Sequence, residues 1–313
     1  MKNILDMLSD PNMQWIFFGC LLLGLSSGVI GSFSYLRKQS LVGDTLAHAA
    51  LPGICIAFML TGVKSIGVFL IGAAVAGAIA TFGIGYITRH SRLKQDAALG
   101  IVLTSFFGLG IVLLTFIQHG KYGNQAGLDK FLFGQAAAMV GSDVITMSII
   151  SIALVTICTL LFKQFKLISF DPGFAKGIGY PVAMLEQLLM LLVVVAVVVG
   201  IQAVGVVLIA ALLITPAVSA RYWTNRLGLM VALSGVFGAL SGALGTWISS
   251  SVSNLPTGPV TVLAATSFFV LSVLFGPQRG VIAKRLLRLQ VKKRFRMENE
   301  GLVTERMKGE TAL

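Results

Sequence analysis

The chain contains runs of apolar residues, free of any charge, that are long enough to cross a lipid bilayer. A helix needs about 20 such residues to span the hydrocarbon core. The charge-free runs of this size are 14–36, 65–88, 97–118, 144–162, 187–220 and 227–278. A soluble fold needs a charged surface, and only 12% of the 313 residues are charged. The sequence therefore predicts an all-α, polytopic membrane protein and excludes secreted disulfide domains, disordered chains and soluble nucleic-acid binders.

The number of transmembrane helices is expected to be eight or nine. The run 187–220 is too long for one crossing at ~1.5 Å per residue. The segment GIQAVG at 200–205 is the expected break, and the count is eight if 187–220 folds as a broken pair. The run 227–278 must form two crossings, divided by the polar segment 249–259.

Basic residues indicate which ends of these spans are cytoplasmic. Lys and Arg gather in four segments between spans and in the tail, namely 37–38, 89–94, 163–176, 221–226 and 278–313. Because cytoplasmic segments of membrane proteins are enriched in Lys and Arg, we expect all five to be cytoplasmic. The C-terminus is then inside, and nine crossings would place the N-terminus outside.

The tail, 278–313, differs in composition from the membrane domain, 14–277, and from the short N-terminal segment 1–13. Between Arg279 and Arg296 it carries eight basic and no acidic residues, alternating with apolar ones. This pattern predicts an amphipathic helix on the anionic inner leaflet, with a disordered end beyond it. Membrane anchoring therefore accounts for the net charge of +12 without a nucleic-acid partner.

Glycine predicts where helices pack closely. Small residues let helix backbones approach each other in lipid, where no hydrophobic force drives helices together. The glycines at helix-packing spacing are Gly24, Gly28, Gly72, Gly77, Gly83, Gly238 and Gly242.

The segment LVGDTLAHAALPG, 41–53, places an acid and an imidazole inside an apolar span. Asp44 and His48 are four residues apart, so on a helix they lie on one face, one turn from each other. A carboxylate in the membrane costs roughly 2.5–3.5 kcal/mol, and an ion pathway is the usual reason to retain one. Carboxylate and imidazole together suit a first-row divalent ion such as Mn²⁺ or Zn²⁺. Two ligands cannot complete a shell, so a second copy of the motif or backbone carbonyls must contribute.

Two other interpretations of this pair remain open at this point. Asp44 lies six residues after Lys38, so it could cap a helix or form an ion pair at the membrane interface, with His48 a hydrogen-bonded buried histidine. Alternatively, the pair could relay protons, since histidine titrates near neutral pH.

The stretch LRKQSLVGDTLAHAALPG, from Leu36, resembles the motif that opens the second span of the ABC transporter permeases importing manganese, zinc or iron. Four further segments stand in the order that this family uses, and the resemblance covers roughly 14–277. These segments are QDAALGIVLTSFFGLGIVL (95–113), FLFGQ (131–135), ISFDPGFAKGIGYPV (168–182) and QAVGVVLIAALLITPAVSARY (202–222). The chain departs from the family in its long tail after Pro277.

The resemblance implies the rest of a transport machine in a bacterial cell membrane. The permease pairs with a second copy or with a sibling permease, cytoplasmic ATPase subunits drive it, and an extracytoplasmic metal-binding protein delivers the ion. Asp44 and His48 fall on the family's pathway metal site. The LPG at 51–53 is more similar to the manganese branch than to the zinc branch. No permanently bound cofactor is implied, since the metal ion is the cargo.

The resemblance also implies a coupling element within the cytoplasmic loop at about 163–185, which would sit in a groove on the ATPase. A surface loop without a partner is the alternative. The coupling residues would be Phe170, Asp171, Pro172, Gly173, Phe174, Ala175, Lys176, Gly177, Ile178 and Gly179.

The chain is not expected to be an enzyme by itself. It contains no phosphate-binding loop of the form GxxxxGKS or GxxxxGKT, so its energy must come from another subunit or from an ion gradient. The alternatives to a metal importer are a gradient-driven carrier, a channel and a permease for metal chelates or vitamins. Pro216 would kink its span, either as a gating hinge or as a static packing feature.

Overall fold

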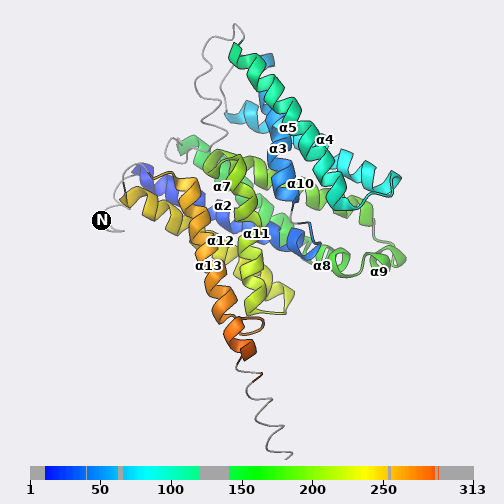
Figure 1. Cartoon of the computed structure of the whole chain (residues 1–313), viewed down its shortest axis with the longest axis vertical. Coiled ribbons are helices and arrows are strands. Elements are labelled where there is room, and N and C mark those ends of the chain that lie inside the picture. Colours follow the sequence, from blue (N-terminus) through cyan, green and yellow to red (C-terminus); the bar gives the residue numbers. More distant parts are fainter. Residues whose placement is uncertain are drawn as a thin grey trace, which may run out of the picture.

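The computed structural model describes residues 11–39, 41–62, 66–119, 141–252, 255–285 and 288, and its regular elements within these ranges are all α-helices (Figure 1). The all-α fold is therefore confirmed. The helices are α2 (Pro11–Leu36), α3 (Val42–Thr61), α4 (Ile66–His90), α5 (Gln95–His119), α7 (Gly141–Leu160), α8 (Phe162–Phe170), α9 (Pro172–Gly177), α10 (Val182–Val204), α11 (Val206–Trp223), α12 (Leu227–Ser251) and α13 (Thr257–Phe275). The motif at 131–135 and most of the basic tail lie outside the described residues.

Eight helices in the described part of the chain are long and apolar enough to cross a membrane. They are α2, α3, α4, α5, α7, α10, α12 and α13. The apolar stretch of α11, Ile209–Trp223, is shorter, so length and composition count eight full spans, with α11 as the shorter half of the predicted broken pair 187–220. The predicted cytoplasmic placement of both 37–38 and the tail requires that α11 carry the chain back across the membrane.

The predicted break within 200–205 is confirmed at Gly205, which separates α10 from α11. Gly205 has φ 92° and ψ 164°, a conformation that a residue with a Cβ adopts only under strain. Beyond the break, the side chain of Ile209 lies against Gly200, so the chain turns back sharply on itself. Glycine at 205 makes this turn possible within an otherwise apolar helical stretch.

Helices α2 and α12 touch through glycines, as the spacing predicts. A Cβ added to Gly24 would collide with the carbonyl oxygen of Gly238, and a Cβ on Gly238 would collide with that of Gly24. One turn away, Gly28 lies equally close to the backbone of Ser234, whose hydroxyl donates a hydrogen bond of 2.7 Å to the Gly28 carbonyl. Gly242 also meets the backbone of α2. These contacts are possible only because four positions carry no side chain.

The predicted glycine contacts of α4 are confirmed only in part. Gly72 lies against the backbone of Gly53 in α3, and Gly77 lies against the side chain of Val194 in α10. Gly83, however, has no atom within 4 Å of the position its Cβ would occupy, so it is not a packing glycine. Gly83 stands six residues after Gly77, and at this position α4 has no close neighbour among the described residues.

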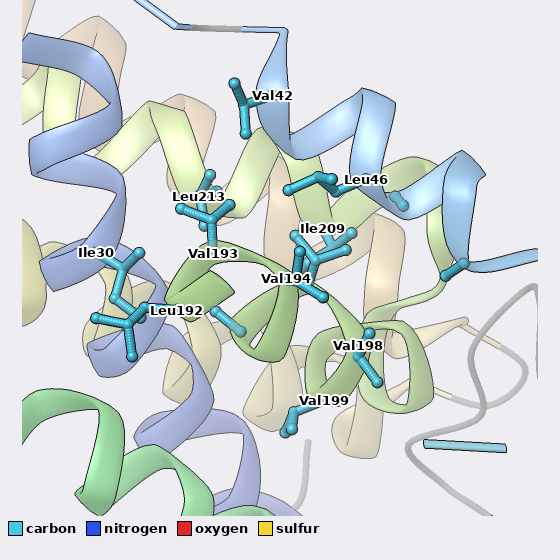
Figure 2. Packing of buried hydrophobic residues seen from close by; sticks show 14 of the residues in the cluster. Ile30, Val42, Leu46, Leu192, Val193, Val194, Val198, Val199, Ile209 and Leu213 are labelled. Carbon is cyan, nitrogen blue, oxygen red and sulfur yellow. The ribbon is translucent and has the colours of Figure 1, made fainter. Parts of the chain in front are cut away.

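The helices form two groups that α10 and α11 connect. Helices α3, α4 and α5 pack together, α2, α7, α12 and α13 form the other group, and α10 and α11 contact members of both (Figure 1). Figure 2 shows the core at this junction, where Val42 and Leu46 of α3 meet Val194 of α10 and Ile209 and Leu213 of α11. The first two turns of α3 are thereby fixed against the centre of the molecule.

Candidate metal site and partner-docking surface

Asp44 and His48 occupy the first and second turns of α3. The distance between Asp44 Oδ1 and His48 Nε2 is 3.5 Å, and the two side chains are 39% and 20% exposed. The expectation that they share one face of a helix is therefore confirmed. The first turn of a helix favours a carboxylate, because the free backbone N–H groups carry partial positive charge there.

This face of α3 is turned away from the protein core. Val42 and Leu46, on the opposite side, are fully buried in the junction shown in Figure 2. Asp44 keeps 39% of its side chain exposed, whereas His48, at 20%, is more deeply set. The pair thus lies on a side of α3 that the described part of this chain covers only in part.

Phe107 of α5 is the neighbour of this pair from another helix. Its ring meets the His48 imidazole edge to face, with the ring centroids 4.7 Å apart and an interplanar angle of 71°. The sequence analysis missed Phe107, because nothing in the local pattern of α5 distinguishes this phenylalanine from its apolar neighbours. Only the packing of α5 beside α3 reveals that it limits the orientation of the imidazole.

The geometry permits the two side chains to share one metal ion. Zinc–nitrogen and zinc–oxygen bonds are about 2.0–2.2 Å long, so donors 3.5 Å apart can both reach a single ion. Within the described ranges no third His, Cys, Asp or Glu joins them in a cluster. In that same part of the chain Asp44 forms no ion pair with Lys38, so the interface-pair alternative is not what the structure shows. Metal binding by this pair stays a prediction, and it requires ligands from elsewhere.

The predicted coupling residues fold as a capped helical turn, α9, after α8. Asp171 begins it, because its carboxylate accepts a hydrogen bond of 2.8 Å from the Phe174 N–H, and Pro172 occupies the first helical position. Gly179, with φ 88°, ends it. The Gly179 N–H donates to the Lys176 carbonyl and the following N–H to the Ala175 carbonyl, a Schellman motif.

The ten predicted coupling residues form an exposed apolar surface. Phe170, Phe174 and Ile178 recur every four residues and are 61%, 57% and 52% exposed. Only Ala175 of this segment is buried. Exposed apolar side chains on a polar loop are typical of a protein interaction site. The structure thus places the segment where a partner can reach it, while its role in coupling stays a prediction.

Pro216 lies inside α11 and is buried, beside the fully buried Leu212 and Leu213. A proline in a helix leaves the carbonyl four residues earlier, here that of Leu212, without its helical hydrogen bond. A kink at Pro216, as a hinge or as a static packing feature, stays a prediction.

An ion pair that the sequence analysis did not identify joins α2 to α10. Arg37 Nη2 donates to Glu186 Oε1 at 2.6 Å, and both side chains are partly buried. Both residues stand at ends of apolar runs, which is the one signal in the sequence. Their separation of 149 positions hides the pairing.

Eight apolar helices of membrane-spanning length, a carboxylate–imidazole pair within one of them and an exposed apolar loop are together typical of a polytopic membrane protein of the transporter class. The chain belongs to the ABC 3 transport family, whose model matches residues 9–276.

Relatives agree with this assignment. The manganese transport system membrane protein MntC of Bacillus subtilis is 54% identical over 285 residues, which cover 90% of this chain and 66% of that protein. The zinc transport system membrane protein TroC of Treponema pallidum is 45% identical over 90% of this chain and 95% of its own length. Among solved structures, PsaBC from Streptococcus pneumoniae in complex with Fab has a TM-score of 0.78 and 36% identity, covering 92% of this chain and 100% of that one.

Proposed function

We propose that the chain is the membrane permease subunit of an ATP-driven ABC importer of divalent metal ions, with manganese as the favoured ion. The observation that carries the proposal is the placement of Asp44 and His48, 3.5 Å apart and partly exposed within an apolar span. Membership of the ABC 3 transport family and relatives named for manganese transport support it.

The transported ion binds between two permease subunits. One chain supplies two ligands, and the missing ones come from the same pair on a second copy or on a sibling permease. Two Asp44 carboxylates would balance the charge of one divalent ion, which offsets the cost of placing each carboxylate in the membrane. The partly exposed carboxylate of Asp44 is the part of this pair that such a partner could reach.

Energy reaches this site through the loop that contains α9. The exposed side chains of Phe170, Phe174 and Ile178 dock on a cytoplasmic ATPase subunit, since this chain has no phosphate-binding loop of its own. An extracytoplasmic binding protein delivers the ion on the other side. The permease is placed in the plasma membrane with its C-terminus in the cytoplasm, in line with the basic tail.

Zinc is the second candidate cargo, because the relative from Treponema pallidum is named for zinc transport. Carboxylate and imidazole serve both ions, so the ligand types do not separate them.

Whole-cell metal content, measured by elemental mass spectrometry, tests the proposal. Cells lacking the gene are complemented with wild type, His48→Ala or His90→Ala under limiting manganese or limiting zinc. His90 is the matched control, since it is exposed at the end of α4, where its Nδ1 lies 3.1 Å from the Tyr86 carbonyl. Wild type and His90→Ala should restore the manganese content, and His48→Ala should not.

The other outcomes are equally informative. If cells lacking the gene are deficient in zinc alone, the proposed mechanism stands and zinc replaces manganese as the transported ion. Unchanged contents of all divalent ions would contradict the importer and favour a structural or proton-carrying pair. Uptake by the purified complex in liposomes should also require ATP, and uptake driven by an ion gradient alone would support a secondary carrier.

A further inference from the structure

A second polar site lies where the C-terminal ends of α2 and α4 meet the N-terminal ends of α5 and α10. A cavity of about 270 Å³ opens there, with a mainly polar lining to which neither Asp44 nor His48 contributes. The charged and amide side chains that line it are Arg37, Arg89, Gln95, Glu186 and Gln187. The cavity is therefore a site in its own right, distinct from the pair on α3.

The charge of this cavity is positive, with two guanidiniums against one carboxylate. The Glu186 carboxylate already accepts a hydrogen bond of 2.6 Å, from Arg37 Nη2 to Glu186 Oε1. Arg89 is exposed and, in the described part of the chain, forms no ion pair. The carboxylate of Asp96 is near in sequence but does not line the cavity. One full positive charge is thus left without a partner beside the cavity.

Arg37 also has a donor that the protein does not use. Its Nη1 is buried and has no hydrogen-bond acceptor among the described residues. An unpaired buried donor is unfavourable, so the positive charge of this guanidinium is only partly compensated within the protein. Because Nη2 is hydrogen-bonded to Glu186, the guanidinium is held in the wall of the cavity.

These groups select an anion with several oxygens. Guanidinium matches phosphate in geometry and in charge, whereas two arginines repel a metal cation. The start of α5, at Gln95, adds the partial positive charge of a 25-residue helix. Basic cavities between membrane helices on the cytoplasmic side recognise the phosphate groups of lipids. The segments 37–38 and 89–94 are the basic ones predicted to lie on that side.

We propose that the cavity between α2, α4, α5 and α10 binds the phosphate head group of an anionic lipid of the inner leaflet. Arg89 holds the phosphate oxygens, the guanidinium of Arg37 adds positive charge from the cavity wall, and the acyl chains extend along the apolar outer surface of α4, where Phe82 and Ile79 are exposed. Bound lipid would join the ends of four helices that come from both helix groups.

The thermal unfolding of the full-length protein in a neutral detergent tests this site. Phosphatidylglycerol, phosphatidylcholine and inorganic phosphate are added separately. At about ten times the dissociation constant, phosphatidylglycerol should raise the Tm of wild type by about 4 °C, and phosphatidylcholine should not. In the Arg89→Gln variant, phosphatidylglycerol should raise the Tm by at most half of the wild-type shift. Arg92→Gln removes the same charge from an exposed residue just beyond α4 that does not line the cavity, and this variant should retain the Tm shift.

Each other result overturns a defined part of the proposal. Equal losses in Arg89→Gln and Arg92→Gln would mean general attraction of a basic surface to anionic lipid, not a site. An equal shift with inorganic phosphate would keep the anion site and overturn the lipid as its source. No shift of wild type with either anion would mean that the cavity holds only water. None of these Tm measurements depends on metal transport, so a failure of the lipid site can be distinguished from a failure of the proposed function.

Discussion

Arg37, at the end of α2, and Glu186, near the start of α10, form a hydrogen-bonded ion pair of 2.6 Å that joins two parts of the chain 149 positions apart. Arg37 directly precedes the turn that leads into α3, and Glu186 follows the loop that contains α9. The pair therefore connects the segment that leads into the candidate metal site with the segment that follows the candidate docking surface.

Breaking this pair should destabilise the protein. Arg37→Gln or Glu186→Gln leaves the other charge partly buried without its partner, which costs about 1–3 kcal/mol. The exchange variant Arg37→Glu/Glu186→Arg should recover part of the loss, and Lys166→Gln, an exposed charge, serves as control. Thermal unfolding in detergent measures all four. Single variants as stable as wild type would show that the ion pair contributes nothing to the fold.

The carboxylate of Asp44 should be required for transport but not for assembly. Asp44→Asn keeps the shape of the side chain and removes the charge that balances the ion, so manganese uptake should fall to the level of cells lacking the gene. Asp96→Asn is the matched control, because Asp96 also stands in the first turn of a membrane helix but is exposed and remote from His48. Normal uptake by Asp44→Asn, with the variant present in the membrane, would remove it from the metal site.

Phe174 should matter to a partner more than to the fold. Because it is 57% exposed, Phe174→Ser should change the stability of the permease by less than about 0.5 kcal/mol. It should nevertheless reduce the amount of ATPase subunit that copurifies with the permease. Val281→Ser removes an equally exposed apolar side chain outside the loop and should copurify normally. The same loss in both variants would contradict a docking role for α9.

The glycine contact between α2 and α12 should tolerate no side chain. Gly238→Ala places a methyl group on the carbonyl oxygen of Gly24, so the helices must separate, at a cost of about 1–3 kcal/mol. Gly83→Ala is the control in α4, where the added methyl group meets open space, and it should be neutral or gain up to about 1 kcal/mol. The unfolding temperatures of Gly238→Ala and Gly83→Ala should be compared. Equal values would mean that α2 and α12 can move apart at no cost in stability.

Replacing Lys38 with glycine should increase the stability of the folded protein. It has φ 58° and ends α2 in a Schellman motif, with its N–H donating to the Tyr35 carbonyl and the Gln39 N–H to the Ser34 carbonyl. This is the conformation that Gly179 adopts at the end of α9, but here a residue with a Cβ adopts it. Lys38→Gly should therefore stabilise the protein by up to about 1 kcal/mol, whereas Lys38→Ala keeps the strain. If both variants unfold at the same temperature, backbone strain at this turn is negligible.

The membrane spans, the break near Gly205 and the four glycines of the contact between α2 and α12 could all be predicted, because each is a local property of the sequence. Hydrophobicity over 20 residues reports how a segment meets lipid, and glycine spacing reports which helix faces can approach closely. The same reasoning failed at Gly83, since spacing indicates a face that can pack and not whether another helix lies opposite it. The shared face of Asp44 and His48 was predictable for the same local reason, from their four-residue separation on a helix.

By itself, then, the sequence determined an all-α membrane protein, the limits of its spans and the pair of ligand types within one of them. The tertiary structure decided that Asp44 stays partly exposed, that Phe107 lies against His48 and that Arg37 meets Glu186. These relationships depend on which helix lies beside which. That choice follows from the fit of whole surfaces, such as Gly24 against Gly238, and each surface combines residues whose partners lie far away along the chain.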